Sequence, residues 1–250
     1  MSIRYVAIGD SFTEGVGDEL PDGAPRGWAD LAAQGWADAR GEPISYANLA
    51  IRGRLAWPIV DEQLEAALAL RPTHLSFNGG GNDMLRPGVA ISSIADAFSR
   101  VLERCDAEGV RLVLLSGANP SAGLPMRRLI QRRGDELSAA VLERVAHRPD
   151  VVRALNWPDR VLSQPRFWSH DRLHMNARGH HRVAARVLDA LGAGAPEEWW
   201  DVPGEETRHL GGAAYYRAHV LPWIRRRVTR RSSGDGRAAK FADWVEVAPA

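Results

Sequence analysis

The stretch that decides the fold lies near the N-terminus, where residues 4–17 have the sequence RYVAIGDSFTEGVG. The apolar run at residues 5–8 predicts a short buried strand. The run ends abruptly at Gly9-Asp10-Ser11, and small and acidic residues follow. The chain therefore presents a serine hydroxyl immediately after a strand, and the segments that follow indicate what surrounds this hydroxyl.

Strand-like and helix-like segments alternate along the chain to about residue 192. Strands are expected at 4–8, 44–51, 73–79, 110–117 and 151–157, and helices at 27–40, 57–70, 89–109, 126–147 and 176–192. Five strands separated by helices favour a parallel sheet that is covered on both faces and connected by right-handed crossovers. Ligands of such folds bind beyond the carboxyl ends of the strands, which is where Ser11 is expected.

The bulk composition is that of one sizeable α/β domain: 250 residues, 45% hydrophobic and 25% charged. The formal net charge of +1 gives no general attraction to nucleic acid or to an anionic membrane. The single cysteine, Cys105, excludes an intrachain disulfide and fits a helix pattern as a packing residue. Neither a membrane span nor a signal peptide is seen, so we expect a cytoplasmic protein, whose oligomeric state stays open.

The last part of the chain, residues 194–250, breaks the alternation of strands and helices. We expect it to be an extension that packs on a main domain of residues 1–193 through Trp199, Trp200, Tyr215 and Trp223. It carries a basic run, made up of Arg225, Arg226, Arg227, Arg230 and Arg231. A solvated helix face is the expected role of this run, with contact to an acidic partner, nucleic acid or a lipid surface as the alternatives.

A serine hydroxyl needs a base and donors for an oxyanion before it can act as a nucleophile. His174 is the favoured base, because Asp171 precedes it by three residues and a carboxylate in the same turn fixes the tautomer of an imidazole. Taken alone, this spacing also arises by chance. His180 and His181 are adjacent on a predicted helix and point about 100° apart, so we expect packing or surface residues and no metal cluster.

A second set of candidates follows the strands expected at 73–79 and 44–51. Three glycines lead to Asn82-Asp83, and glycines let the backbone approach a ligand while Asn82 offers a side-chain amide donor. A turn built from favoured turn residues is the alternative interpretation. A phosphate-binding loop is disfavoured, because no Gly-Lys-Ser/Thr follows. Gly53 follows the earlier strand, and its backbone N–H is a further candidate donor at the same sheet edge.

The order of these short motifs resembles that of the SGNH hydrolases, also called GDSL-type esterases and lipases. The four matching blocks are Gly9-Asp10-Ser11, Gly53, Gly80-Gly81-Asn82-Asp83 and Asp171-Arg172-Leu173-His174. The resemblance extends over about residues 4–191 and assigns residues 1–193 as the catalytic domain. One departure is Phe12, which stands where leucine is common in the family; a bulky apolar side chain is kept.

This resemblance implies a flavodoxin-like three-layer α/β/α sandwich with a five-stranded parallel sheet. It implies Ser11 as nucleophile, His174 as base and then acid, and Asp171 as the residue that orients the imidazole. The oxyanion hole would comprise the N–H groups of Ser11 and Gly53 and the side-chain amide of Asn82. Gly9, Asp10, Gly80 and Asp83 would support these groups, and no metal or organic cofactor is needed.

The expected function is therefore that of a serine esterase or acylhydrolase, which cleaves a small-molecule carboxylic ester through an acyl-serine intermediate. Three alternatives stay open: a non-catalytic ligand-binding domain of the same fold, a carbohydrate or small-molecule deacetylase, and an interaction protein that acts through its basic extension. The sequence does not give the acyl-chain preference, because the pocket walls come from the loops 12–27, 84–90 and 118–128.

Overall fold

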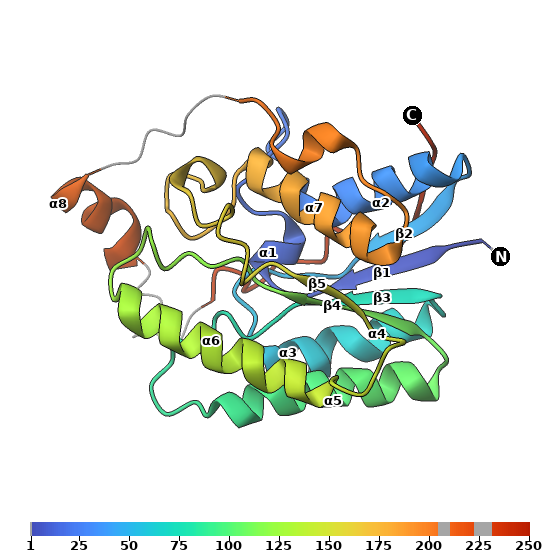
Figure 1. The fold of residues 1–250 in the computed structure, drawn as a ribbon, viewed down its shortest axis with the longest axis horizontal. Coiled ribbons are helices and arrows are strands. Elements are labelled where there is room, and N and C mark those ends of the chain that lie inside the picture. The colour runs from blue at the N-terminus through green and yellow to red at the C-terminus, as the bar shows by residue number, and fades with distance from the viewer. Residues whose placement is uncertain (1, 205–210, 223–231) are drawn as a thin grey trace.

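The structure is a computed structural model that describes residues 2–204, 211–222 and 232–250. Its centre is a six-stranded sheet in the order β5-β4-β3-β1-β2-β6 (Figure 1). The strands are β1 (Arg4–Ile8), β2 (Ile44–Asn48), β3 (His74–Phe77), β4 (Arg111–Ser116), β5 (Val152–Leu155) and β6 (Phe241–Val247). The first five are parallel, as the sequence predicts, and their carboxyl ends form one edge of the sheet.

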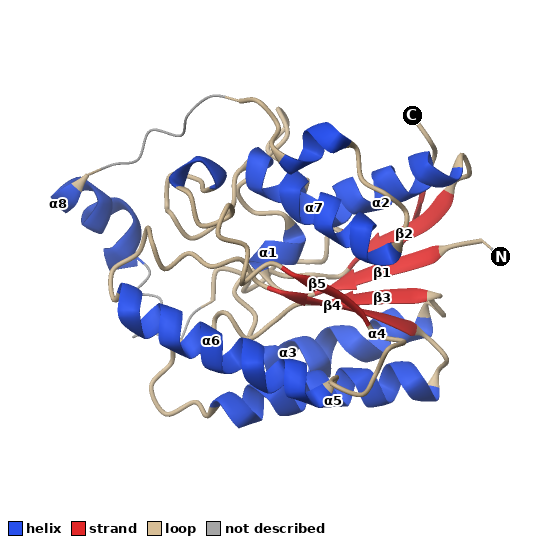
Figure 2. Ribbon diagram, viewed as in Figure 1, coloured by secondary structure: helices blue, strands red, loops and turns tan. Residues whose placement is uncertain are grey.

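Helices connect the parallel strands and cover both faces of the sheet (Figure 2). They are α1 (Ser11–Glu14), α2 (Gly27–Arg40), α3 (Ala56–Ile59), α4 (Glu65–Ala69), α5 (Ile91–Ala107), α6 (Arg127–Arg144), α7 (Ala177–Leu191) and α8 (Gly212–Tyr215). A π-helical turn, Val60–Leu64, joins α3 to α4, and a second one, Tyr216–Val220, continues α8; two 3-10 helices lie at Pro165–Phe167 and Glu197–Trp200. The helices predicted from periodicity all form, within a few residues of their expected ends.

Two apolar cores lie on the two faces of the sheet, because successive side chains of a strand point to opposite faces. In β1, Val6 and Ile8 join the core under α3–α6, whereas Tyr5 and Ala7 join the core under α2 and α7. Cys105 is fully buried in the first of these cores, where burial raises the pKa of its thiol to about 12. The three-layer α/β/α sandwich is therefore confirmed.

The sheet has one strand more than the five that the sequence predicts. β6 comes from the C-terminal extension and runs antiparallel to β2, with Val245 opposite Tyr46 and Phe241 opposite Asn48. Phe241 also meets the ring of Tyr46 edge-on, at 6.1 Å between centroids. Phe241, Val245 and Val247 stand at odd-numbered positions and contact the same core, but Asp243 interrupts the apolar alternation that would indicate a strand.

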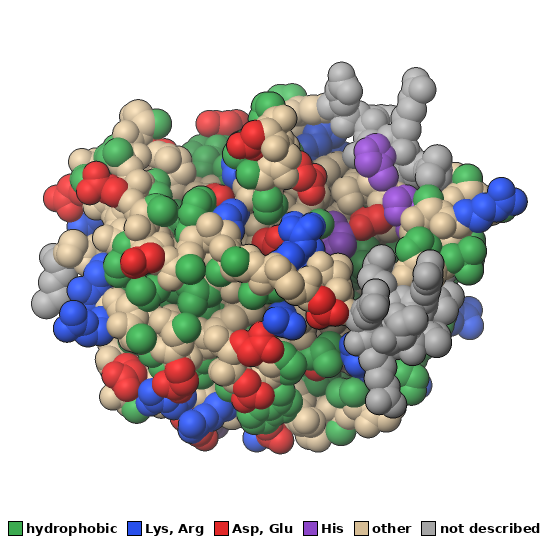
Figure 3. All heavy atoms as spheres, turned by 180° about the vertical axis from the view of Figure 1, so that it is seen from behind, with side chains coloured by type: hydrophobic (Ala, Val, Ile, Leu, Met, Phe, Trp, Pro, Cys, Tyr) green, Lys and Arg blue, Asp and Glu red, His purple; other side chains and the backbone are tan. Residues whose placement is uncertain are grey.

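The extension packs on the main domain through some of the expected aromatic residues. Trp199 contacts the core under α2 and α7, and Tyr215 is buried. Trp200 lies beneath the guanidinium groups of Arg182 and Arg186. Trp223 and the basic run at 225–231 fall outside the described residues, and the boundary at residue 193 stays a prediction. On the face seen in Figure 3, acidic and basic side chains are interspersed. No helix in the described ranges is long and apolar enough to cross a bilayer.

Candidate active site

Ser11 is placed by the tight junction between β1 and α1. Asp10 caps α1, and its Oδ1 accepts a hydrogen bond from the backbone N–H of Phe12 at 3.1 Å. The side chain of Gln63 binds both polar groups of the Gly9 backbone, at 2.9 and 3.0 Å. A Cβ on Gly9 would lie 2.5 Å from Thr13 Oγ1 and 2.9 Å from the Asn78 carbonyl oxygen, so only glycine fits. The junction thus fixes Ser11 as the first residue of α1.

Ser11, His174 and Asp171 form a continuous series of hydrogen bonds, although residues 11 and 174 are far apart in the chain. His174 Nε2 lies 3.0 Å from Ser11 Oγ, and His174 Nδ1 lies 2.6 Å from Asp171 Oδ2. The other carboxylate oxygen of Asp171 accepts bonds from the backbone N–H groups of Leu173 and His174, each at 2.9 Å, and from the hydroxyl of Ser169 at 2.8 Å. The carboxylate is therefore fully occupied and held in one orientation.

These bonds also keep Asp171 ionised. Burial by itself raises the pKa of this carboxyl, but the hydrogen bond and electrostatic attraction to His174, with the two backbone N–H groups, outweigh it. The net result is a pKa well below the usual range for an aspartic acid. An ionised carboxylate beside Nδ1 favours the tautomer in which Nδ1 carries the proton and Nε2 is free to accept one from Ser11.

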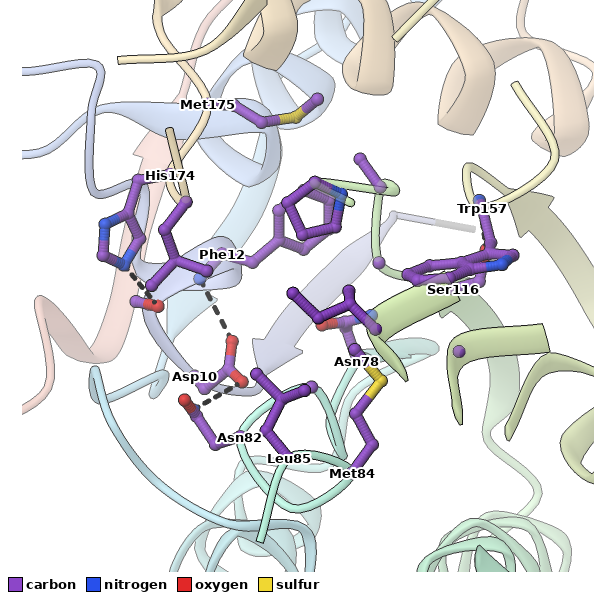
Figure 4. Close-up of a pocket in the computed structure, with 18 of the residues that line it drawn as sticks. Asp10, Phe12, Asn78, Asn82, Met84, Leu85, Ser116, Trp157, His174 and Met175 are labelled. Carbon is purple, nitrogen blue, oxygen red and sulfur yellow. Dashed lines mark hydrogen bonds between the residues drawn. The ribbon is translucent and has the colours of Figure 1, made fainter. Parts of the chain in front are cut away.

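The three predicted oxyanion donors are only partly brought together. Ser11 and Asn82 line one common cavity, whereas Gly53 is not among its lining residues. The side-chain amide of Asn82 donates to Asp10 Oδ2 at 3.1 Å (Figure 4) and to the Arg54 carbonyl oxygen at 3.0 Å. Both of its hydrogens are thus directed at protein acceptors. Gly53 has a φ of +75°, and a Cβ there would lie 2.4 Å from Ser232 Oγ.

The remaining motif residues hold the backbone in place. Asp83 Oδ2 accepts the N–H of Ala56 at 3.0 Å, which ties the loop after β3 to the start of α3. Gly80 has a φ of +88°, and a Cβ there would lie 2.5 Å from Ile94 Cγ2, so glycine is required. Asp10 is buried, and burial raises its pKa to about 6 although it accepts the Phe12 N–H.

Several contributors to the site carry no signal in the sequence. The carboxylate of Glu14 accepts the backbone N–H of Arg52 at 2.6 Å and its guanidinium Nε at 2.8 Å, so it ties down the loop that contains Gly53. From the extension, the hydroxyl of Tyr215 donates to the Asp171 carbonyl oxygen at 3.0 Å, and the Arg172 guanidinium stacks on the same ring. These partners are found only when segments distant in sequence meet.

The two helical histidines are packing residues, as expected. His180 is completely buried, its Nδ1 accepts the backbone N–H of Trp28 at 3.1 Å, and its Nε2 faces the Val16 carbonyl oxygen. His181 binds the Ala177 carbonyl oxygen and meets the ring of Trp199. Within the described part of the chain, no group of three or more His, Cys, Asp or Glu side chains is arranged to hold a metal ion.

A sheet of parallel strands that presents a serine, a histidine and an aspartate at its carboxyl edge is typical of hydrolases that act on ester bonds. This chain belongs to one family of such enzymes, the GDSL-like lipase/acylhydrolase family, whose model matches residues 7–182. The protein is accordingly an ester-bond hydrolase. α8 and β6 lie beyond the matched region.

Solved structures of other esterases share the fold. The lipase/acylhydrolase from Enterococcus faecalis has a TM-score of 0.62 at 18% identity, covering 76% of this chain and 95% of its own. The psychrotrophic esterase EstA from Pseudoalteromonas sp. has a TM-score of 0.60 at 18% identity, with 76% and 96% covered. The acetylxylan esterase Axe2 from Geobacillus stearothermophilus has a TM-score of 0.58 at 18% identity, with 82% and 96% covered. No curated protein matches the sequence.

Proposed function

We propose that this protein is a serine esterase that cleaves carboxylic esters through an acyl-serine intermediate. The observation that carries the proposal is the series of hydrogen bonds from Ser11 Oγ to His174 Nε2, 3.0 Å, and from His174 Nδ1 to Asp171 Oδ2, 2.6 Å. Each of the three side chains has the partner that its role requires. A binding domain without catalysis would have no need for this alignment.

In the proposed mechanism, Ser11 Oγ attacks the ester carbonyl carbon while His174 Nε2 takes the hydroxyl proton. The imidazolium that forms is stabilised by the Asp171 carboxylate. The tetrahedral intermediate collapses when the alcohol oxygen leaves with the proton from Nε2, and the acyl group stays on Ser11. A water molecule then attacks the acyl-serine, gives its proton to Nε2, and the acid is released as Ser11 regains its hydrogen.

The oxyanion that forms in both steps needs fixed donors. We assign this role to the backbone N–H group of Ser11 and the side-chain amide of Asn82, which both line the cavity. The N–H of Gly53, which lies outside that lining, is the third donor that the family resemblance implies. Because both hydrogens of the Asn82 amide already point at the Asp10 carboxylate and the Arg54 carbonyl, one of them has to be shared with or released to the oxyanion. Loss of one such donor raises the activation free energy by about 2.7–4 kcal/mol.

The test is replacement of the nucleophile. Ser11→Ala should lower kcat for a p-nitrophenyl ester by a factor on the order of 10⁶, since the members of such a triad act as a unit. Ser92→Ala, on the exposed start of α5, is the control and should keep full activity. A fluorophosphonate probe should label the native protein and the control but not Ser11→Ala. Undiminished turnover by Ser11→Ala would refute the proposal.

A carbohydrate deacetylase is the second candidate, because Axe2, one of the structures with this fold, is an acetylxylan esterase. Another is a lipase/acylhydrolase, so the fold accepts both kinds of ester. The acyl side of the cavity is what distinguishes them in this chain.

A further inference from the structure

A cavity of about 560 Å³ includes Ser11 and His174 and continues between the sheet and α6. This volume is within the range of sites that enclose small organic ligands. Apolar side chains lie around the space near the catalytic groups, among them Phe12, Leu85 and Met175 (Figure 4). The cavity therefore extends well beyond what a reacting ester group alone requires.

One wall of the cavity is a single face of α6. Ile130, Leu137 and Val141 line it, and their spacing places them on one side of the helix; Leu142, which follows Val141, lines the cavity from the margin of that side. Because α6 follows β4 and leads back to the start of β5, it runs from the catalytic edge toward the opposite edge of the sheet. The distance along the axis from residue 130 to residue 142 is about 18 Å at 1.5 Å per residue. The cavity is thus long in the direction that leads away from Ser11.

The opposite wall comes from the sheet and α5. Leu114 of β4, Leu155 of β5 and Phe98 of α5 line the cavity, and Leu114 and Phe98 are buried in the apolar core on this face. An occupant of this part of the cavity is therefore in contact with the same kind of surface as a core side chain.

Trp157 fixes the shape of the cavity beside α6. Its indole lies so close to Gly134 that a Cβ there would be 1.9 Å from Trp157 Cζ2. The indole Nε1 donates to Asp135 Oδ1 at 2.8 Å, and the backbone N–H of Trp157 donates to Ser116 Oγ at 2.9 Å. Hydrogen bonds therefore hold both the backbone and the indole ring of Trp157, and they fix the position of this side chain beside the cavity.

Two polar side chains in this region, those of Asn78 and Ser116, are already bound within the protein. The amide of Asn78 donates to the Leu115 carbonyl oxygen at 3.1 Å, and Ser116 Oγ accepts the N–H groups of Asn156 and Trp157. A sugar in this part of the cavity would lose hydrogen bonds to water and find few replacements, which is costly. An alkyl chain loses nothing and gains apolar burial.

We propose that the cavity under α6 holds the acyl chain of the substrate, and that the substrate class is esters of medium- to long-chain fatty acids. This inference rests on the proposed esterase function, because the acyl chain is attached to the carbonyl carbon that Ser11 attacks. Each methylene that passes from water into the cavity raises kcat/KM by about fourfold, the factor that corresponds to its burial.

The first experiment is a series of p-nitrophenyl esters from acetate through butyrate and octanoate to dodecanoate, below their solubility limits. We expect kcat/KM to rise from acetate to octanoate by a factor of about four thousand, which is fourfold for each of the six added methylenes. If acetate is the best substrate and kcat/KM falls with chain length while Ser11→Ala is inactive, the acyl-chain inference is overturned and the proposed function stands. If no ester is cleaved at all, the proposed function itself fails.

The second experiment obstructs the cavity from α6. Ser138 lines the cavity and is half-buried, whereas its neighbour Ala139 is exposed. Ser138→Phe should lower the ratio of octanoate to acetate kcat/KM by at least tenfold, and Ala139→Phe, the matched control, should leave the ratio unchanged. An unchanged ratio in a folded Ser138→Phe variant would overturn the inference.

A third variant covers the case in which Ser138→Phe does not fold. Leu142→Ala enlarges the far part of the cavity, so it should raise the ratio of dodecanoate to octanoate kcat/KM. A ratio that does not change would contradict the placement of the acyl chain along α6.

Discussion

The loops at the carboxyl ends of the strands and the C-terminal segment, residues 211–222 and 232–250, both contribute to the site, but different kinds of contact hold them. In the loops, Asp10 and Asp171 bind backbone N–H groups two or three residues away. In the C-terminal segment, Lys240 Nζ binds the carbonyl oxygens of Glu14, Pro25 and Arg26 and the carboxylate of Asp30, all more than 200 residues away. Local bonding leaves a motif in the sequence, whereas distant bonding leaves none.

The comparison predicts that changes in the loops remove activity while changes in the C-terminal segment remove stability. Asp171→Asn gives the largest effect: an amide can still accept the N–H groups of residues 173 and 174, but its NH₂ group faces His174 Nδ1 and favours the wrong tautomer. We expect kcat to fall about 10⁴-fold with little change in the urea unfolding midpoint.

Asp189→Asn, on the exposed side of α7, is the control for this variant and should be active. If Asp171→Asn instead unfolds at a much lower urea concentration while its kcat is normal, the prediction that changes in the loops affect activity rather than stability is contradicted.

What could be predicted from the sequence follows the same division. The parallel strands and their helices were predictable because each has its own periodicity, and Ser11, Asn82 and the pair Asp171/His174 because short motifs surround them. β6 was missed, since its pairing with β2 depends on a strand about 200 residues earlier in the chain. The Glu14–Arg52 pair and the contact of Tyr215 with residue 171 could not be predicted either, because no local pattern specifies a partner that distant folding supplies.

Lys240 gives the next largest effect, on stability. It is the only lysine among 32 basic residues, and its ammonium lies among four oxygen acceptors with the side chain 11% exposed. Lys240→Met takes the cation from the Asp30 carboxylate and one hydrogen bond from each of three carbonyl oxygens. We expect the free energy of unfolding to fall by about 3 kcal/mol, measured by urea denaturation.

Two further variants sharpen this result. Lys240→Arg should rescue little, because a planar guanidinium cannot direct its hydrogens into a site shaped for a compact ammonium. Arg237→Met removes a cation from an exposed position of the same segment and should leave stability within about 0.5 kcal/mol. If Arg237→Met and Lys240→Met are equally stable, net charge rather than the buried ammonium is responsible.

Gly53 is one of the points at which the two regions touch. Its φ of +75° costs an L-residue roughly 1–2 kcal/mol, and a new Cβ would lie 2.4 Å from Ser232 Oγ. Gly53→Ala should therefore lower the free energy of unfolding by about 2 kcal/mol. Adding Ser232→Ala removes the shortest contact but keeps the backbone strain and the approach of Ser233 Oγ at 2.9 Å, so the double variant should recover part of the loss. Purely additive effects of the two substitutions would show that the regions do not contact each other at residue 53 in solution.

The last effect, that of His180, is measured as a slope with pH. It tests whether the two kinds of contact, local and distant, coincide with the two regions of the molecule. It belongs to α7 within the family-matched part of the chain, yet its Nδ1 accepts the N–H of Trp28, 152 residues away. Accepting this bond requires a neutral ring, and burial lowers the pKa of His180 to about 4.

In the unfolded chain a histidine binds its proton below about pH 6.5. The folded protein does not protonate His180 until about pH 4, so the unfolded state is favoured increasingly as the pH falls between these values. The contribution to the free energy of unfolding is complete above pH 6.5 and is lost by about 1.4 kcal/mol per pH unit on the way down to pH 4. His74, whose pKa burial also lowers to about 4, adds a slope of the same sign.

His180→Gln should reduce this slope by about 1.4 kcal/mol per pH unit, because His74 is present in both proteins and cancels in the difference. Urea denaturation of the two proteins between pH 4.5 and 6.5 measures it. Equal slopes would mean that His180 is protonated in the folded state and that the bond from Trp28 is not made. A reduced slope would show that a contact between residues distant in sequence stabilises the family-matched region as well. Whether a contact can be predicted from the sequence then depends on how far apart its two residues are, and not on the region in which they lie.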